Sequence, residues 1–252
     1  MRNLGLIMNL SKLQIESDLL SRNAYQLINL TDYKEFKKKE EKLVLRYKPY
    51  YLQCSIPSSK LQLIHCLEEN GFRFVEFRLR KTLNLNNYEH INSMAYYPYK
   101  LIVIQEDSQK KCAEKILLSN YSDDRFSNDP LVKSNIAKKR LLDYLNKSFL
   151  NYPREFIYGL VDHNSNRLIS FMTGENINQK EVVFYLTYVD INFDKEKFFQ
   201  IIETLVISEL HRMGIIFIKS ITSGFNVSEL NTSINKLNFV VDETFIILRK
   251  IY

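Results

Sequence analysis

Two hydrophobic patterns follow each other in the first ninety residues. Residues 60–70 place their leucine and isoleucine side chains on one helical face, whereas residues 72–80 alternate apolar with charged side chains. The first pattern predicts a helix that begins after a Pro-Ser-Ser segment and ends at Gly71, where left-handed backbone is favoured. The second predicts a half-buried strand, and one slip in its period indicates a β-bulge. Together with strand and helix patterns over 23–54, this predicts a small N-terminal α/β domain over residues 1–90.

The pattern after residue 98 is longer and follows a different order. Residues 84–98 are rich in Asn, lack periodicity and are interpreted as a linker. The predicted order beyond them is strand, two helices, three strands, helix, strand, helix and strand. The corresponding ranges are 99–104, 109–120, 132–151, 154–162, 167–175, 182–190, 195–213, 215–222, 228–238 and 239–252. We therefore expect a second domain, residues 99–252, with a mixed central sheet flanked by helices.

The ends of the two predicted domains resemble each other. The segment ENGFRFVEFRLRK (69–81) and the segment KLNFVVDETFIILRK (236–250) both run from a helix end through a turn residue and a phenylalanine into a strand. Two degenerate copies of one unit would explain this echo. A chance recurrence of helix, turn and strand would explain it as well.

Composition and charge narrow the class of protein. The chain has 252 residues, of which 45% are hydrophobic and 25% charged, and these are globular proportions. No apolar run approaches the roughly 20 residues that span a bilayer, and the N-terminus lacks a signal-peptide pattern, so we expect a cytoplasmic protein without a membrane partner. The net charge of +6 suits a phosphorylated ligand or a polyanion. No groove-reading motif accompanies it, so nucleic-acid binding is not expected.

Cysteine and histidine spacing gives no sign of a metal site. The three cysteines, Cys54, Cys66 and Cys112, form no CxxC pair, and the four histidines are scattered. No histidine has a second ligand at metal-binding spacing, so we predict no metal. Cys54 and Cys66 lie in apolar patterns, where a free cysteine usually packs as a small hydrophobe.

Three local features accompany the element order of residues 99–252. The strand VVFYLTYVD (182–190) is followed by a helix from residue 195, the segment DDRFSNDPLV spans 123–132, and Asn226 precedes Phe239 near the end of the chain. This combination resembles the GNAT N-acyltransferases, in particular those that acylate dTDP-linked amino sugars, such as the dTDP-fucosamine acetyltransferase type. The resemblance implies an α/β (α+β) fold, with a GNAT-like mixed central sheet and a smaller N-terminal α/β domain that is a candidate degenerate half-GNAT.

The resemblance also implies an activity and a co-substrate. It implies transfer of an acetyl or larger acyl group from acyl-CoA to the amine of a dTDP-linked amino-deoxy sugar by direct attack, for surface polysaccharide synthesis, with no metal. A homodimer stays open. The residues that the resemblance places at the acyl-CoA site are Val189, Lys195, Lys197, Phe198, Asn226 and Asn231.

The chain departs from the family pattern at the diphosphate-binding loop. The family's glycine positions fall within 194–199, and no glycine occurs between Gly174 and Gly214. Glycines allow backbone N–H groups to approach a phosphate closely. Lys195 and Lys197 are expected to substitute for them through side-chain charge, although both also suit an exposed helix start.

The resemblance and the positions of polar residues around the predicted site together give candidates for catalysis and for acceptor binding. The family's general-acid tyrosine is replaced by Ile234, and the candidates for catalysis are Tyr185, Tyr188, Glu175 and Ser233. The candidates for binding the nucleotide sugar are Arg125, Phe126 and Asp129. Phe126 also suits a core position, and Arg125 a salt bridge to a neighbouring aspartate.

Two other functions remain open on the sequence. A Fem-like transferase fed by aminoacyl-tRNA is built from paired GNAT-like domains, which would explain the basic charge, the internal echo and the missing glycines. A non-catalytic GNAT-like module that binds a sugar nucleotide or a partner protein would explain the lost glycines and tyrosine.

Overall fold

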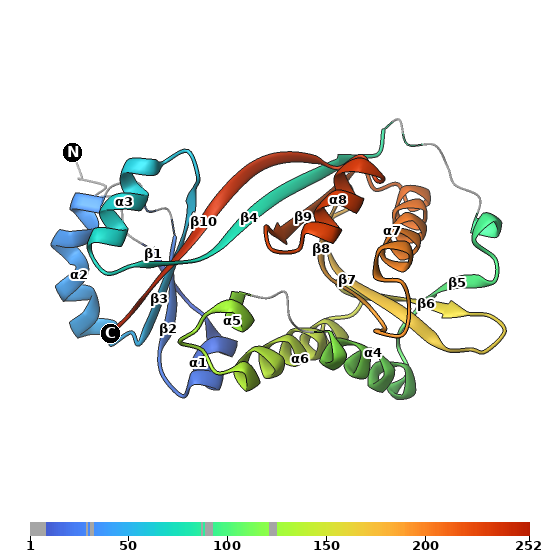
Figure 1. Ribbon diagram of the computed structural model, residues 1–252, viewed down its shortest axis with the longest axis horizontal. Helices are drawn as coiled ribbons and strands as arrows, with labels where there is room; N and C mark the ends of the chain where they lie inside the picture. Colours follow the sequence, from blue (N-terminus) through green and yellow to red (C-terminus); the bar gives the residue numbers. More distant parts are fainter. Residues whose placement is uncertain (1–8, 29, 31–32, 87, 89–92, 121–124) are drawn as a thin grey trace.

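The computed structural model describes residues 9–28, 30, 33–86, 88, 93–120 and 125–252, and it is built on one large sheet (Figure 1). The ten strands of the described residues are ordered β1-β2-β3-β10-β4-β9-β8-β7-β6-β5. Their bounds are β1 Asn9–Lys12, β2 Ala24–Ile28, β3 Tyr51–Pro57, β4 Arg73–Asn84, β5 Tyr99–Val103, β6 Glu155–Asp162, β7 Leu168–Asn178, β8 Glu181–Val189, β9 Phe217–Ser223 and β10 Val240–Ile251.

Helices cover both faces of this sheet. Their bounds are α1 Gln14–Leu20, α2 Tyr33–Tyr47, α3 Leu61–Glu69, α4 Asp107–Ser119, α5 Arg125–Asn128, α6 Ser134–Leu150, α7 Lys195–Arg212 and α8 Val227–Asn235, with a 3₁₀ turn over Ser93–Tyr96. The predicted mixed α/β sheet is confirmed. The pattern missed β1, α1 and the short helix α5, which lies in the segment expected to be a polar loop.

Two long strands carry the chain between the halves of the sheet. β10 pairs with β3 on one side and β4 on the other, and β4 pairs with β10 and β9. The last strand of each predicted domain is therefore inserted beside a strand of the other domain, and Figure 1 shows β4 and β10 crossing the middle of the molecule together. The two parts of the chain share one continuous sheet rather than each closing a sheet of its own.

The two halves are related by an approximate two-fold repeat. In the N-terminal half, β2 and β3 are parallel and are followed by α3 and β4; in the C-terminal half, β8 and β9 are parallel and are followed by α8 and β10. Within this repeat, each residue of β4 and its equivalent in β10 differ in residue number by the same amount. Arg78 corresponds to Phe245, which is its cross-strand partner, and the residue skipped in β4, Val75, corresponds to the residue skipped in β10, Asp242. The bulge predicted in the 72–80 strand is thus confirmed at Val75.

The internal echo lies on this same offset. Gly71 (φ 91°) corresponds to Asn238 (φ 61°), so both copies have a left-handed residue in the turn between helix and strand. The phenylalanines that follow, Phe72 and Phe239, are both buried. The shared topology favours two degenerate copies of one unit over a chance recurrence.

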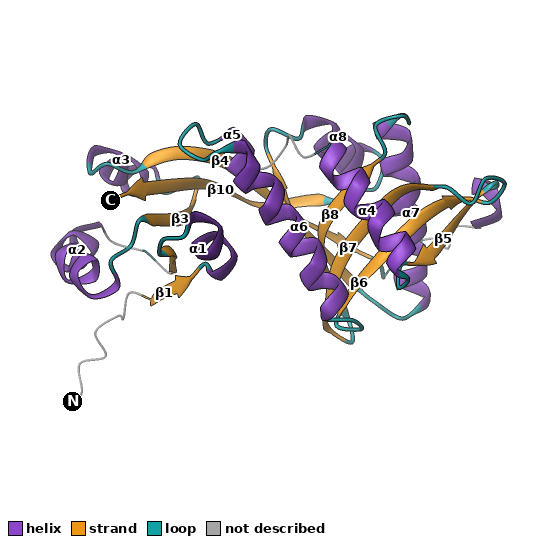
Figure 2. Cartoon of the chain, turned by 90° about the horizontal axis from the view of Figure 1, so that it is seen from below, coloured by secondary structure: helices purple, strands orange, loops and turns teal. Residues whose placement is uncertain are grey.

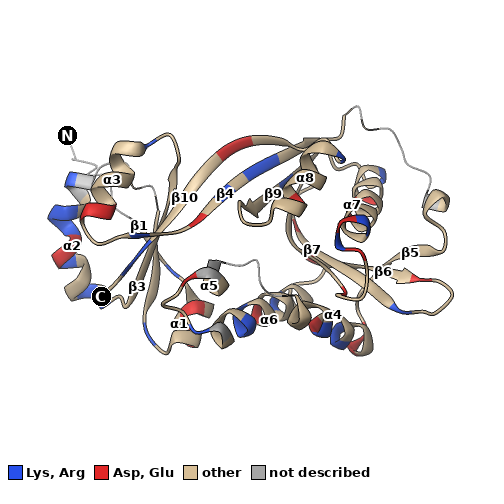
Figure 3. Cartoon of the chain, viewed as in Figure 1, with Lys and Arg blue, Asp and Glu red and all other residues tan. Residues whose placement is uncertain are grey.

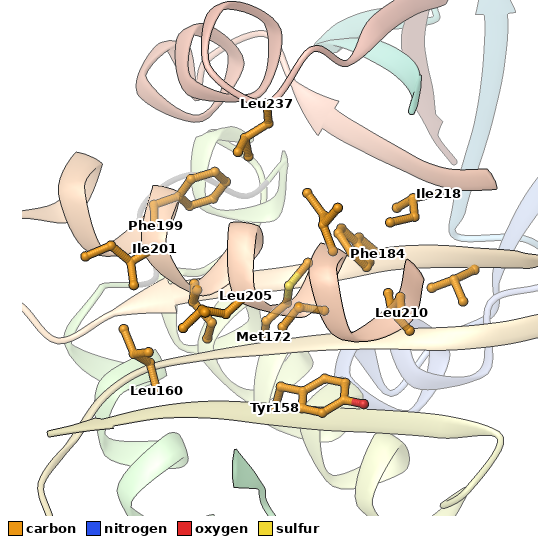
Figure 4. Packing of buried hydrophobic residues seen from close by; sticks show 14 of the residues in the cluster. Tyr158, Leu160, Met172, Phe184, Phe199, Ile201, Leu205, Leu210, Ile218 and Leu237 are labelled. Atoms are coloured by element: carbon orange, nitrogen blue, oxygen red, sulfur yellow. The ribbon is translucent and has the colours of Figure 1, made fainter. Parts of the chain in front are cut away.

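Side chains alternate between the two faces of the sheet along each strand, and in the C-terminal half the two faces pack against different helices. Phe156, Tyr158 and Leu160 of β6 pack toward α7 with Met172 and Phe184 (Figure 4), whereas Ile157 and Val161 pack toward α4 and α6. α7 is buried over most of its length, as its apolar pattern predicts. Seen from below, α1, α5, α6 and α4 form a layer under the sheet, and α6 runs from one half toward the other (Figure 2).

Candidate functional site

β8 and β9 begin as a parallel pair and then separate. They pair from Glu181–Phe217 to Phe184–Ser220, and beyond Phe184 the described strand β8 pairs only with β7. At the point of separation the β7–β8 register shifts, and the Leu186 N–H donates to the Thr173 hydroxyl oxygen at 3.2 Å. A bulge of this kind increases local twist, which turns β8 away from β9.

A cavity of about 470 Å³ occupies the opening between these strands. Its lining includes Thr187 of β8 and Ser223 of β9, Asn226 and Glu229 of α8, and the side chains of α6 on the other face of the sheet. Because α7 and α8 lie on one face and α6 on the other, the cavity passes through the sheet at the separation. Residues of the N-terminal half, among them Gln26, Glu76 and Arg78, close its far side.

Backbone groups of β8 face this opening. The N–H groups of Leu186 and Asp190 donate toward β7, to Thr173 and to the Ile169 carbonyl. In an antiparallel strand successive residues point their hydrogen-bonding groups to opposite edges, so the N–H groups of Thr187 and Val189 point toward the separation. The Val189 carbonyl accepts a bond from the Asn120 side chain at 2.9 Å.

The N-terminus of α7 is capped by a carboxylate. The Asp194 side chain accepts a hydrogen bond from the Lys197 N–H at 2.9 Å, and Glu196 adds a second acidic residue to the first turn. An acidic N-cap is favourable to the helix dipole. One of the backbone donors that could approach an external anion here is therefore already bonded to a side chain of this chain.

A buried polar cluster lies beneath the separation, where α7 and α8 pack on the sheet. Lys81 of β4 is 1% exposed and donates to the Glu229 carboxylate at 3.1 Å and to the Ser233 hydroxyl at 2.7 Å. Asn226 donates to the same carboxylate at 2.7 Å, and the Thr222 hydroxyl also donates to it. These donors fix Glu229 at the cavity wall.

Glu203 of α7 is also part of this cluster. The Thr187 hydroxyl lies 3.4 Å from its Oε1, and its Oε2 has no hydrogen-bond partner among the described residues. Burial raises the pKa of Glu203 to about 8, against the opposing influence of Lys81. Its carboxyl group is therefore mainly protonated at neutral pH.

Tyr185 and Glu175 lie together at the outer edge of the cavity. The Tyr185 hydroxyl donates to Glu175, which Arg154 also contacts at 2.6 Å. Partial burial, followed by the neighbouring carboxylate, raises the pKa of Tyr185, and the hydrogen bond from Tyr185 lowers the pKa of Glu175. Tyr185 lines the cavity, whereas Glu175 is absent from its lining.

The cavity brings together part of the predicted site. The predicted residues that line it are Tyr185, Tyr188, Val189, Lys195 and Asn226. The predicted residues outside its lining are Glu175, Ser233, Lys197, Phe198, Asn231, Phe126 and Asp129. Phe198 is buried in the core against Tyr99 and Phe193, Lys197 lies over the Phe198 ring, and Asn231 is exposed.

The predicted acceptor segment joins the two halves of the molecule. Phe126 is 1% exposed and stacks on Tyr51 of β3 with ring centroids 5.6 Å apart. Asp129 is 3% exposed and accepts two hydrogen bonds, at 2.8 and 2.9 Å, from Arg249 of β10. These contacts correct the expectation that Phe126 and Asp129 face a ligand, because both side chains are occupied within the fold. The Arg125 side chain lies outside the described residues.

Sequence reasoning missed the residues that the N-terminal half and α6 contribute to the cavity. Glu76 and Arg78 were interpreted as the solvent-facing side of a half-buried strand, yet Glu76 is 2% exposed. Arg140 and Tyr144 lie in the helix predicted over 132–151, and the sequence pattern assigned no role to either of them. The only local signal was the density of charge in the middle of a strand, and it does not say what covers the charged face.

Several simpler expectations can be compared with the described residues. Cys54 is buried, and burial raises the pKa of its thiol to about 12, as expected for a packed cysteine; Cys66 is partly buried and Cys112 exposed. Within the described ranges, no group of three or more His, Cys, Asp or Glu side chains is arranged to hold a metal. In the same part of the chain no helix is both long and apolar enough to cross a membrane.

Comparison with known proteins places the fold. No protein-family profile matches the sequence, and no curated protein is significantly similar to it. The fold is similar to that of a GCN5-related N-acetyltransferase (GNAT) from Sphaerobacter thermophilus (TM-score 0.66, 10% identity, 96% of this chain and 76% of that chain). It is also similar to a GCN5-related N-acetyltransferase from Kribbella flavida (0.60, 10%, 90% and 81%) and to a tandem GNAT protein from the clavulanic acid biosynthesis pathway (0.56, 9%, 90% and 75%). The chain therefore has a GNAT fold.

Proposed function

We propose that this protein is an N-acyltransferase that moves an acyl group from acyl-CoA to an amine. The observation that carries the proposal is the cavity at the separation of β8 from β9, reached from both faces of the sheet. A donor entering from the α7 side and an acceptor entering from the α6 side would meet there. Holding two reactants together in one place supplies a large part of the acceleration of an acyl transfer.

The residues at the separation of β8 from β9 fit the pantetheine arm of acyl-CoA better than its diphosphate. The outward-facing backbone of Thr187 and Val189 suits the amide-containing pantetheine arm, which pairs with a strand edge. The diphosphate fits the start of α7 less well, because the Asp194 carboxylate already accepts the Lys197 N–H there and adds a negative charge. Lys195 lines the cavity and is the cationic side chain closest in sequence to that helix start.

The chemistry needs little from the protein beyond position and charge. Acyl-CoA would supply a thioester carbonyl. The Thr187 N–H, which points into the separation, is our choice for stabilising the oxyanion that forms when an amine attacks. Tyr185, whose raised pKa keeps it protonated, and Tyr188 remain proposed proton donors to the leaving thiolate. Glu175 acts through Tyr185, and Ser233 acts through Lys81.

The proposed acceptor is a nucleotide-linked amino sugar, of which a dTDP-linked amino-deoxy sugar is the specific candidate. Its support is the sequence resemblance described above together with a cavity that combines cationic and aromatic side chains, including Arg78, Lys147 and Tyr144. The test is release of free thiol from acetyl-CoA and longer acyl-CoAs in the presence of dTDP-amino sugars. Thiol release above the rate without acceptor supports the proposal; no release, together with no thermal shift from CoA, contradicts it.

A non-catalytic GNAT-like module is the second candidate. It is favoured by the Asp194 cap, since a carboxylate at the position of a diphosphate disfavours donor binding by charge repulsion. This candidate predicts binding of a dTDP-sugar without thiol release from any acyl-CoA. The same titration therefore separates the two candidates.

A further inference from the structure

Arg78 lies where the cavity meets the N-terminal half. β9 ends at Ser223, the residue that pairs with Arg78, and β4 continues beyond this point beside β10 alone. Arg78 and Ser223 both line the cavity. The guanidinium group therefore sits at the far wall of the cavity, across the end of β9 from the separated strand β8.

The guanidinium group of Arg78 is only partly used within the fold. Its Nε donates to Glu76 at 2.5 Å, and no described residue accepts a hydrogen bond from its two terminal nitrogens. Its side chain is 25% exposed, whereas that of Glu76 is 3% exposed. The buried carboxylate thus holds one edge of the guanidinium and leaves the other edge, with its paired N–H groups, for a carboxylate or phosphate.

The cationic side chains around the same cavity are not equivalent. Arg140 is committed to Glu16 at 2.8 Å and lies over the rings of Phe126 and Tyr144. Lys147 of α6 lines the cavity, and among the described residues its charge acts on Glu175 without forming an ion pair with it. Arg78 and Lys147 therefore form the part of the lining suited to an anionic group.

We propose that Arg78, oriented by Glu76, binds an anionic group of the acceptor, a phosphate or a carboxylate, so that the N-terminal half serves as the acceptor-binding half. The proposal rests on the proposed acyl transfer at the neighbouring separation. It gives the N-terminal half a role in selecting the acceptor. Phe126 and Asp129 do not have this role. Glu76 is a positioning residue in this arrangement.

The experiment measures binding and turnover separately. Binding of dTDP and of inorganic phosphate is measured by calorimetry for the wild-type chain, for Arg78→Gln and for the matched control Arg212→Gln, whose guanidinium pairs with Glu209 on α7. Loss of a charge-assisted hydrogen-bonded contact should weaken dTDP binding about 10- to 100-fold in Arg78→Gln and leave the control unchanged. Arg78→Lys, which keeps the charge and loses the fork, should bind with intermediate affinity. Binding of phosphate but not of the nucleotide would identify the source as a small anion.

Turnover distinguishes this proposal from the proposed function. For Arg78→Gln the KM for a dTDP-amino sugar should rise at least about tenfold while kcat changes little, and Glu76→Gln should raise the same KM by a smaller factor. If thiol release occurs and neither KM nor dTDP affinity responds to Arg78, the anion site is wrong and the acyltransferase stands. If dTDP affinity depends on Arg78 and no thiol is released, the site stands and the acyltransferase is wrong. Failure of the wild-type chain to bind either dTDP or phosphate overturns the site outright. Thermal unfolding of each variant checks that it is folded.

Discussion

The two copies of the repeated unit differ most at their parallel strand pairs. In the N-terminal copy the described part of β2 runs to Ile28, one residue beyond its last pair with β3, Leu27–Cys54. In the C-terminal copy β8 continues for five residues beyond its last pair with β9, as far as Val189. A strand in the middle of a sheet that extends beyond its neighbour leaves backbone groups open to a ligand. Both copies thus have the same topology, whereas we expect the acyl-CoA site in the C-terminal copy alone.

The side chains of β4 and β10 also differ between the two copies. Leu248 of β10 is fully buried in the apolar core of the N-terminal copy, and its counterpart on β4 is Lys81, equally buried beneath α8. Charged residues occur along both strands (Figure 3). Burying a lysine with its carboxylate partner is usually no more stabilising than an apolar pair. The charge cluster beside the cavity in the C-terminal copy is thus replaced by apolar packing at the matching position of the N-terminal copy.

The largest expected effect comes from making this position alike in the two copies. Lys81→Leu should lower the free energy of unfolding by about 3 kcal/mol, the lower end for a buried ion pair, because it leaves the Glu229 carboxylate, whose side chain is 18% exposed, without its cation. Adding Glu229→Gln to the same chain should recover much of the loss. Urea unfolding provides the measurement, with Leu248→Met as a matched control expected to cost less than about 1.5 kcal/mol. A single variant as stable as the wild type would mean that the cluster is not electrostatically coupled.

The buried Glu203 gives the C-terminal copy a characteristic pH dependence. Its pKa of about 8 in the folded state exceeds that of an ordinary carboxyl, so the folded chain binds the extra proton and stability falls as the pH rises toward 8. Between pH 6 and 9 the wild type should lose about 2–3 kcal/mol more than Glu203→Gln. Glu209→Gln on the same helix is the control: the pKa of Glu209 is lowered, so it is ionised throughout this range and its replacement should leave the slope unchanged. Parallel slopes for wild type and Glu203→Gln would show that Glu203 is ionised in the folded state.

Two lysines at the start of α7 offer a smaller and more selective test of the donor site. Lys195 lines the cavity and Lys197 does not, although both are exposed and two residues apart. Lys195→Ala should raise the KM for acyl-CoA several-fold, about 1 kcal/mol, whereas Lys197→Ala should change it less than twofold. Steady-state thiol release measures both. Equal effects, or none, would place the diphosphate elsewhere.

The smallest expected effect concerns the carboxylate that caps α7. Asp194→Ser keeps a good N-cap and removes the charge, so the KM for acyl-CoA should fall about two- to fivefold. The KM for S-acetyl-pantetheine, which lacks the nucleotide, should not change. Asp162→Ser, at the last residue of β6, is the matched control. A higher KM for acyl-CoA in Asp194→Ser would mean that Asp194 supports donor binding rather than opposing it.

Much of the secondary structure was readable from local pattern, and the site was readable only in part. The ranges for α7, β8 and β9 follow from helical and strand periodicity. Gly71 and Asn238 indicate the turns that follow α3 and α8. Tyr185, Tyr188, Val189, Lys195 and Asn226 were found because they belong to the elements that form the separation. Glu76, Arg78 and Glu203 were not, because alternation tells which face a residue occupies and not what packs on that face.

The sequence by itself determined the kinds of element, their order and the echo between the two copies, since each is set by contacts a few residues apart. The tertiary structure alone decided that β4 and β10 lie beside strands of the opposite copy, that Phe126 and Asp129 tie α5 to that copy, and that Arg78 closes a cavity opened by β8. The reason is that strand partners and buried ion pairs join residues far apart in the chain. Their choice depends on the free energy of packing the whole molecule, which no local pattern contains.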